Sequence, residues 1–261
     1  MFITKAIAQQ LESCIKQSHI EVTKRYGHGQ FLELSTGAAC FSGVDSYLSQ
    51  VVGWGFDLKP QQYASELNKI EQFYKTVKHN RVDIEFCPYT GNDLAIFLSE
   101  NGYSITELNN VCTLDLLQFD PVPLLSGGFV IRELKADEIE DWAMTIAIGF
   151  DYPPAQEQFV QYAQAKNILV FGVFDKKSLI AGATLALHHP MCDLAVTSTL
   201  PEYRNLGLQK KLLITRLNYA KQRGLKLAMV TTEPGSISEL NGQKVGFRCA
   251  YTRIKLTRLA L

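Results

Sequence analysis

Apolar positions along the first half of the chain alternate between helical and strand-like spacing. Apolar residues recur every three or four positions over residues 3–22 and 63–77, which is the spacing of amphipathic helices. Short apolar runs bounded by glycine and turn residues predict strands at 30–34, 38–41, 47–52, 82–87 and 113–117, and a short helix at 93–100. Together these elements predict a complete α/β unit.

The order of elements repeats after a stretch rich in proline and glycine at 119–128. Here the pattern predicts strands at 129–134, 168–174, 179–187, 193–198 and 225–232, helices within 136–150 and 155–166, and a helix from 208 onward. Residues 82–88 parallel 226–234, and the Glu100-Asn101-Gly102-Tyr103 turn parallels Lys244-Val245-Gly246-Phe247. We expect an internal duplication, with two unrelated α/β halves as the alternative. The predicted domains are 1–118 and 129–261, joined by a linker at 119–128.

Composition narrows the class of protein. The chain has 261 residues, and 46% apolar content is enough to build full cores. Lys plus Arg equals Asp plus Glu at 26 each, so no global field favours nucleic acid or an anionic membrane surface. The longest apolar runs are strand-sized, and residues 1–10 lack the apolar core of a signal peptide. We therefore expect a cytoplasmic protein with no nucleic-acid or membrane partner.

The six cysteines are scattered along the chain without a Cys-x-x-Cys pair. This usage is typical of small buried apolar residues in a reducing compartment. We expect no metal site.

The stretch 199–209 joins a strand to a helix through a loop that contains Gly207. Free backbone N–H groups and the helix dipole at such a helix start favour phosphate, and a glycine lets a pyrophosphate approach those donors. An ordinary strand-turn-helix corner is the alternative. A nucleotide-binding P-loop is excluded, because no Lys-Ser or Lys-Thr follows the glycine.

The loop sequence Tyr203-Arg204-Asn205-Leu206-Gly207-Leu208-Gln209 resembles the coenzyme A pyrophosphate loop of the GNAT family of N-acetyltransferases. The family pattern is Gln or Arg, two residues, Gly, one residue, then Gly or Ala. Arg204 and Gly207 match this pattern, whereas Gln209 departs from it. The resemblance continues through the strand at 225–232 to the Gly246-Phe247 corner. It implies an acyl-CoA N-acyltransferase fold, a mixed β-sheet flanked by helices, with two GNAT-like units in tandem.

The resemblance also implies acetyl-CoA as cosubstrate, held by a strand, the loop and one downstream asparagine. The implied cofactor-binding residues are Thr197, Ser198, Thr199, Arg204, Asn205, Leu206, Gly207, Leu208, Gln209 and Asn241. For Arg204 the alternative is a solvated cation at a helix start, and for Asn241 it is packing within a short helix.

Acetyl transfer needs a neutral amine and a donor for the developing oxyanion. Asp193 opens the strand before the loop and is the candidate base. Water, His188, His189 or a residue of the first half are the alternatives, and we expect the two histidines at a solvated strand end. The Tyr that protonates the leaving thiolate in many family members is replaced by Gly242. Either Tyr251 or Tyr203 takes that role, or the thiolate leaves without a protein acid.

The first half lacks an equivalent phosphate loop. At 53–60 it has bulky aromatics, Asp57 near the predicted helix start, and Pro60, which lacks an N–H donor. We therefore expect only the second half to bind the cofactor. The first half then covers the second, supplies part of an acceptor pocket, or has a purely structural role.

Two functions follow from this sequence. The first is an N-acetyltransferase that moves the acetyl group of acetyl-CoA to a primary amine of a small molecule or peptide, by direct attack in a ternary complex. The alternative is a non-catalytic coenzyme A-binding sensor or structural module. The sequence does not predict the acceptor or the oligomeric state.

Overall fold

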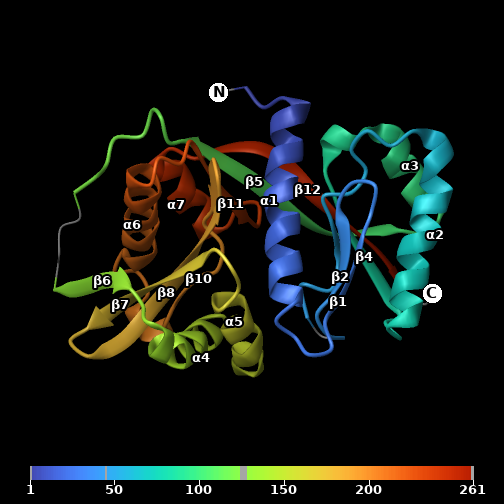
Figure 1. Ribbon diagram of the computed structural model, residues 1–261. Helices are drawn as coiled ribbons and strands as arrows, with labels where there is room; N and C mark the ends of the chain where they lie inside the picture. The colour runs from blue at the N-terminus through green and yellow to red at the C-terminus, as the bar shows by residue number, and fades with distance from the viewer. Residues whose placement is uncertain (1, 45, 124–127, 260–261) are drawn as a thin grey trace. The chain divides into compact units, whose positions relative to one another are not determined.

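The computed structural model describes residues 2–44, 46–123 and 128–259. They divide into two compact units (Figure 1). Unit 1 consists of residues 2–111 and 249–259, and unit 2 of residues 112–248. Among the residues described, no helix has the length and apolar character needed to span a membrane.

The described residues of unit 1 form three α-helices on a mixed sheet. Its elements in chain order are α1 (Lys5–Thr23), β1 (Gln30–Glu33), β2 (Ala38–Phe41), β3 (Val51–Val52), α2 (Pro60–Thr76), β4 (Arg81–Phe86), the 3-10 turn η1 (Pro88–Thr90), α3 (Asn92–Glu100), most of β5 (Ser104–Asp115) and nearly all of β12 (Arg248–Leu259). The strand order is β1-β2-β3-β4-β12-β5. Pro60 takes the first position of α2, as expected, because a missing N–H is tolerated there.

The two faces of β2 explain the layering of unit 1. Ala38 and Cys40 pack with Ile20 of α1, whereas Ala39 packs into the cluster that includes Tyr63 and Ile70 of α2. Alternate residues of a strand point to opposite faces, so α1 covers one face and α2 the other. Figure 1 shows α1 and α2 on either side of this sheet.

The predicted third strand at 47–52 is too long. Only Val51 and Val52 form β3, because the backbone turns before them: Ser49 N donates to Ser46 O at 3.0 Å and Gln50 N to Leu48 O at 3.0 Å. An apolar run therefore gives the strand its position but not its length.

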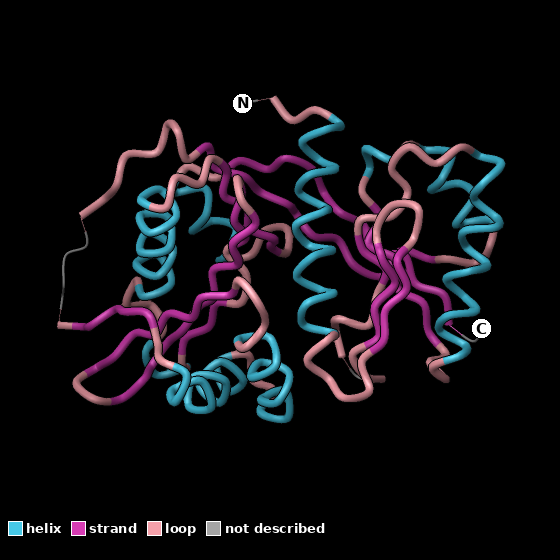
Figure 2. Tube along the Cα trace, in the orientation of Figure 1, coloured by secondary structure: helices cyan, strands magenta, loops and turns pink. Residues whose placement is uncertain are grey.

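Unit 2 has the same alternation of strands and helices (Figure 2). Its elements are the end of β5, β6 (Phe129–Glu133), η2 (Ala136–Glu138), α4 (Ile139–Gly149), η3 (Pro153–Ala155), α5 (Gln156–Ala163), β7 (Ile168–Asp175), β8 (Ser178–His188), β9 (Met191–Asp193), β10 (Thr197–Thr199), η4 (Pro201–Tyr203), α6 (Leu208–Gln222), β11 (Leu227–Thr232) and α7 (Ile237–Val245). The strand order is β5-β11-β9-β8-β7-β6, and β10 pairs with β8.

Helices pack on both faces of the unit 2 sheet. On one face, α4 and α5 form a buried cluster around Trp142, and a Cβ added to Gly182 of β8 would lie 2.2 Å from Trp142 Nε1. Only glycine permits this close approach of α4 to the strand. On the other face, Leu208, Leu212 and Leu217 of α6 are buried, as the helical spacing predicts.

The compact units do not follow the predicted domain boundaries. β12 pairs with β4, from Ile254 opposite Phe86 to Leu259 opposite Arg81, and so belongs to unit 1. Residues 112–115 of β5 belong to unit 2. The end of β5, the last strand of the first half, thus belongs to unit 2, and nearly all of β12, the last strand of the second half, belongs to unit 1. Within the predicted linker, Val122 exchanges hydrogen bonds with Asn218 of α6, and residues 124–127 lie outside the described residues.

Candidate functional site

Two neighbouring strands of unit 2, β9 and β11, separate where the candidate site lies. β9 runs parallel to β11 as far as Asp193 opposite Met229, and β10 then pairs with β8 instead. The strand expected at 193–198 is therefore broken by a bulge. A pocket opens between Thr197 of β10 and Val230 of β11, and its other lining residues are Gln209, Leu213, Arg216, Ser238, Asn241 and Gly242.

The loop after β10 presents the start of α6. Asn205 and Gly207 both have left-handed backbone angles, with φ of 64° and 70°. The backbone bond from Lys211 N to Gly207 O (3.1 Å) closes the first turn of α6, so the N–H groups before it remain for a ligand. A Cβ added to Gly207 would meet no atom within 4 Å. This helix start is therefore open to an anion such as a pyrophosphate.

Arg204 is exposed and ties the loop to the end of α4. Its Nη2 donates to Gly149 O at 2.8 Å, and its Nε lies 3.5 Å from Thr199 O. These two contacts leave further guanidinium N–H groups for a phosphate. Arg204 is thus more than a solvated cation, because it also orders the loop.

Gln209, which departs from the GNAT pattern, connects two helices beside the pocket. Its Nε2 donates to Ser238 Oγ at 3.2 Å, and its Oε1 accepts from Asn241 Nδ2 at 2.6 Å. Both partners belong to α7. Asn241 does line the pocket, as a coenzyme-binding role requires, but this side-chain amide uses one of its donors on Gln209.

The remaining cofactor candidates fall into two groups. Leu206 is 49% exposed at the loop, whereas Leu208 is buried in the core under α6. In β10, Thr197 lines the pocket, Ser198 is buried, and Thr199 contributes its carbonyl to Arg204. The structure therefore brings Thr197, Gln209 and Asn241 to one pocket, with the Gly207 helix start beside it.

Asp193 ends β9 next to the bulge and is buried. Its charge interacts with that of Arg216. His188 was expected at a solvated strand end, but it is buried, and burial lowers the pKa of its imidazole to about 4. His188 is therefore neutral near pH 7, while His189 is exposed.

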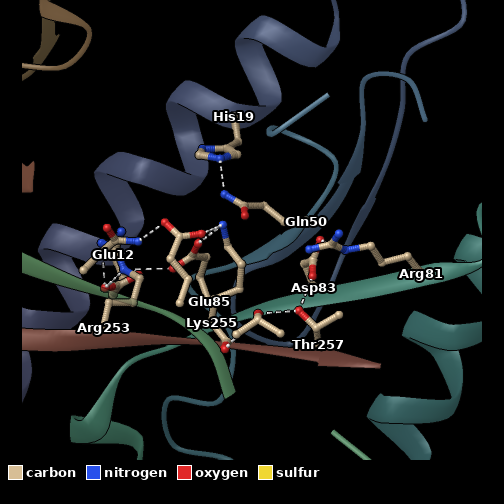
Figure 3. A network of polar contacts seen from close by, with 12 residues as sticks. Glu12, His19, Gln50, Arg81, Asp83, Glu85, Arg253, Lys255 and Thr257 are labelled. Carbon is tan, nitrogen blue, oxygen red and sulfur yellow. Dashed lines mark hydrogen bonds and ion pairs between the residues drawn. The ribbon is translucent and has the colours of Figure 1, made fainter. Parts of the chain in front are cut away.

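Tyr251 lies in unit 1, on β12, and contacts a buried polar network. Figure 3 shows Glu12, Glu85 and Arg253 of that network. Its Oη donates to Glu12 Oε1 at 2.7 Å, and Arg253 Nε donates to the same oxygen at 3.0 Å. Burial, followed by the Glu12 charge, raises the pKa of the Tyr251 hydroxyl. The hydroxyl proton is used in the hydrogen bond to Glu12. The structure therefore gives no support to Tyr251 as the acid that protonates the leaving thiolate. Tyr203, the other candidate, packs partly buried against the unit 2 core.

The corresponding loop of unit 1 is filled by its own side chains. Trp54 and Phe56 are each 1% exposed, and Asp57 accepts a hydrogen bond from Lys5 at 2.8 Å. Pro60 removes an N–H donor from the first turn of α2. Buried aromatics and a missing donor make this helix start a poor phosphate site. That only the second half binds the cofactor stays a prediction.

Two structural features were not predicted from the sequence, and the first belongs to the site. Arg216 is 1% exposed and lines the pocket, and the only sequence signal is a charged residue beside the apolar positions Leu212, Leu213 and Ala220 of α6. Cys249 is exposed, whereas the other five cysteines are buried as expected.

The sequence matches no protein-family model, and it matches no curated protein. Solved structures are similar in fold. A GCN5-related N-acetyltransferase from Kribbella flavida matches with a TM-score of 0.70 and 16% identity over 94% of this chain and 95% of its own. A tandem GNAT protein from the clavulanic acid biosynthesis pathway matches with a TM-score of 0.67 and 14% identity, over 94% and 88% of the two chains. A GCN5-related N-acetyltransferase from Sphaerobacter thermophilus matches with a TM-score of 0.65 and 12% identity, over 99% and 94%.

These similarities extend over nearly the whole chain. The protein has the fold of tandem GNAT proteins, with a mixed sheet flanked by helices in each unit. The resemblance drawn from the loop sequence is thereby confirmed at the level of fold.

Proposed function

We propose that the protein is an acetyl-CoA-dependent N-acetyltransferase that uses unit 2 to bind the coenzyme. The observation that carries this proposal is the combination, in one unit, of separated strands and an open helix start at Gly207. The helix start suits the pyrophosphate, and the pocket beside Thr197 and Asn241 suits the pantetheine arm. The fold shared with GNAT proteins agrees with this assignment.

In the proposed reaction a primary amine of a small molecule or peptide attacks the thioester directly. The amine must lose a proton, and Asp193 is the proposed base, directly or through water. The coenzyme thiolate leaves and takes a proton from solvent, since Gly242 replaces the tyrosine of the family pattern and Tyr251 is committed to Glu12.

A non-catalytic coenzyme A sensor is the second candidate. The contacts of Gln209 with Ser238 and Asn241 favour this candidate. These three polar side chains line the pocket that a pantetheine arm would enter, and they bond to one another there.

Titration with acetyl-CoA, coenzyme A and ATP, followed by thermal shift and calorimetry, tests the proposal. A ligand present at 100 times its dissociation constant should stabilise the native state by about 2.7 kcal/mol. An amine library with detection of the released thiol then separates the two candidates: thiol release identifies the enzyme, and coenzyme binding without release identifies the sensor. Absence of binding by both coenzyme species would contradict both.

A further inference from the structure

Arg216 is an unusual residue for the middle of a helix that packs on a sheet. It is 1% exposed, and it lines the pocket together with Thr197 and Leu213. An arginine is seldom buried unless its charge is compensated and its donors have acceptors. The acceptors of Arg216 therefore show what the residue holds in place.

Three of its four acceptors belong to the bulge between β9 and β10, to the first residue of β10 and to β8 opposite. Arg216 Nη1 donates to Thr184 O at 2.7 Å and to Ala195 O at 3.2 Å. Its Nη2 donates to Thr197 Oγ1 at 2.9 Å, and its Nε to Leu212 O at 3.2 Å. Burial lowers the pKa of the guanidinium to about 9, with the Asp193 charge opposing the decrease, so the group is a cation near pH 7.

The bulge itself is strained. Asp193 pairs with Ala186 and Thr197 with Ala183, so Leu194, Ala195 and Val196 face only two residues of β8. Val196 has φ of 33°, which is uncommon for a β-branched residue and persists only where the surroundings enforce it. Strain of this kind is typical of functional sites.

The Ala195 carbonyl accepts hydrogen bonds from several donors. Besides Arg216, it accepts from Thr184 Oγ1 at 2.9 Å and from Thr184 N at 3.4 Å. This carbonyl shares one peptide group with the N–H of Val196. A cation and a hydroxyl on the oxygen polarise the group and make its N–H a stronger donor. Across the described part of the chain, the hydrogen bonds include none donated by that N–H.

We propose that Arg216 is a positioning residue for acyl transfer, acting through the peptide group between Ala195 and Val196. Arg216 fixes this peptide at the point where the chain leaves β11, between β9 and β10, and it polarises the peptide group. Val196 N–H then stabilises the oxygen of the thioester carbonyl. The inference rests on the proposed function. The amine nitrogen bonds to the carbonyl carbon while the C=O electron pair moves to oxygen. Collapse then breaks the C–S bond, the coenzyme leaves as thiolate, and the amine proton passes to the base.

The test compares wild type with Arg216→Met, which keeps side-chain length but removes charge and donors. Each protein is titrated with acetyl-CoA by calorimetry, and the infrared stretch of the bound, ¹³C-labelled thioester carbonyl is then recorded. In wild type we expect the stretch to lie below that of free acetyl-CoA. In Arg216→Met it should return toward the free value, with turnover about 100-fold to 1,000-fold lower, the loss typical of one oxyanion donor. Coenzyme affinity should change by less than about threefold.

Thr184→Val provides the second variant, because it leaves Arg216 in place and removes one donor from Ala195 O. It should shift the carbonyl stretch in the same direction by a smaller amount, and it keeps the test decisive if Arg216→Met does not fold. Arg223→Met, at the exposed end of α6, is the control and should change neither quantity.

A carbonyl stretch that is unchanged in variants that bind acetyl-CoA would overturn the role of Arg216 and leave the proposed function intact. Failure of wild type to bind acetyl-CoA would overturn both.

Discussion

Asn241 of α7 donates a hydrogen bond to Gln209 of α6 at 2.6 Å, and Gln209 in turn donates to Ser238 at 3.2 Å. The residue that breaks the GNAT loop pattern is thus bonded to the asparagine that the same pattern assigns to the pantetheine arm. One of the two N–H donors of Asn241 is therefore occupied by Gln209, and a coenzyme that takes this donor must displace the glutamine.

Gln209→Ala should therefore tighten coenzyme binding. A hydrogen bond of this kind contributes about 0.5–1.5 kcal/mol, so releasing the bond to Asn241 corresponds to roughly twofold to tenfold in affinity. Calorimetry with coenzyme A measures the change. Gln222→Ala, an exposed glutamine at the far end of α6, should leave affinity unaltered. Weaker binding by Gln209→Ala would mean that the glutamine itself holds the coenzyme.

Arg204→Ala should weaken coenzyme binding about tenfold or more, because charge-assisted contacts contribute roughly 1.5–3 kcal/mol. The loss should shrink at high salt, since the contact is exposed. Arg223→Ala removes an exposed arginine from the opposite end of α6 and is the matched control. Equal affinities for wild type and Arg204→Ala at low salt would restrict Arg204 to its contact with Gly149.

Asp193→Asn should lower turnover by about 100-fold to 10,000-fold, the usual loss for a general base, with coenzyme affinity intact. The pH profile of turnover, measured once an acceptor is known, provides the check. An identical acidic limb in wild type and variant would assign the base to water or to another group, and would leave Asp193 as the countercharge of Arg216.

The fold was largely predictable, because its signals are local. Helical spacing located α1, α2 and α6, and Pro60 gave the first residue of α2. The bulge at Ala195 and Val196 was not predictable, because an apolar run has the same pattern whether the strand is continuous or broken. Likewise, β12 looks like the last strand of the second half, yet its partner β4 is about 170 residues away in the sequence.

The site was predictable only where backbone conformation depends on residue type. Gly207 and Asn205 suit left-handed angles, and both adopt them. The roles of Arg216 and Tyr251 depend instead on distant partners: Thr184 and Ala195 for the first, and Glu12 for the second. Spacing along the chain contains no information about such partners.

Acid should destabilise unit 1 through His19. Its Nδ1–H donates to Ile15 O at 2.9 Å and its Nε2 accepts from Gln50 at 3.0 Å, so the neutral ring is the bonded form (Figure 3). Burial, together with the charges of Arg253 and Lys255, lowers the pKa to about 4. The unfolded chain binds this proton at higher pH than the folded chain does. The His19 contribution to stability is therefore present above about pH 6.5 and is lost as the pH falls toward 4.

Urea unfolding of wild type and His19→Gln between pH 7 and pH 4 measures this dependence. The variant should lose less stability over that window, by up to about 3 kcal/mol. Parallel curves for the two proteins would show that His19 does not set the acid sensitivity.

The central claim, that the start of α6 binds the coenzyme phosphates, is tested most directly by a calorimetric titration of coenzyme A into Gly207→Glu and Gly224→Glu. The two glycines lie at opposite ends of α6 with φ of 70° and 73°, and an added Cβ meets no atom within 4 Å at either. Strain and folding effects are therefore matched, whereas only the first variant places bulk and negative charge at the helix start. We predict that Gly207→Glu abolishes binding and that Gly224→Glu binds as wild type does. Equal affinities in the two variants would contradict the claim.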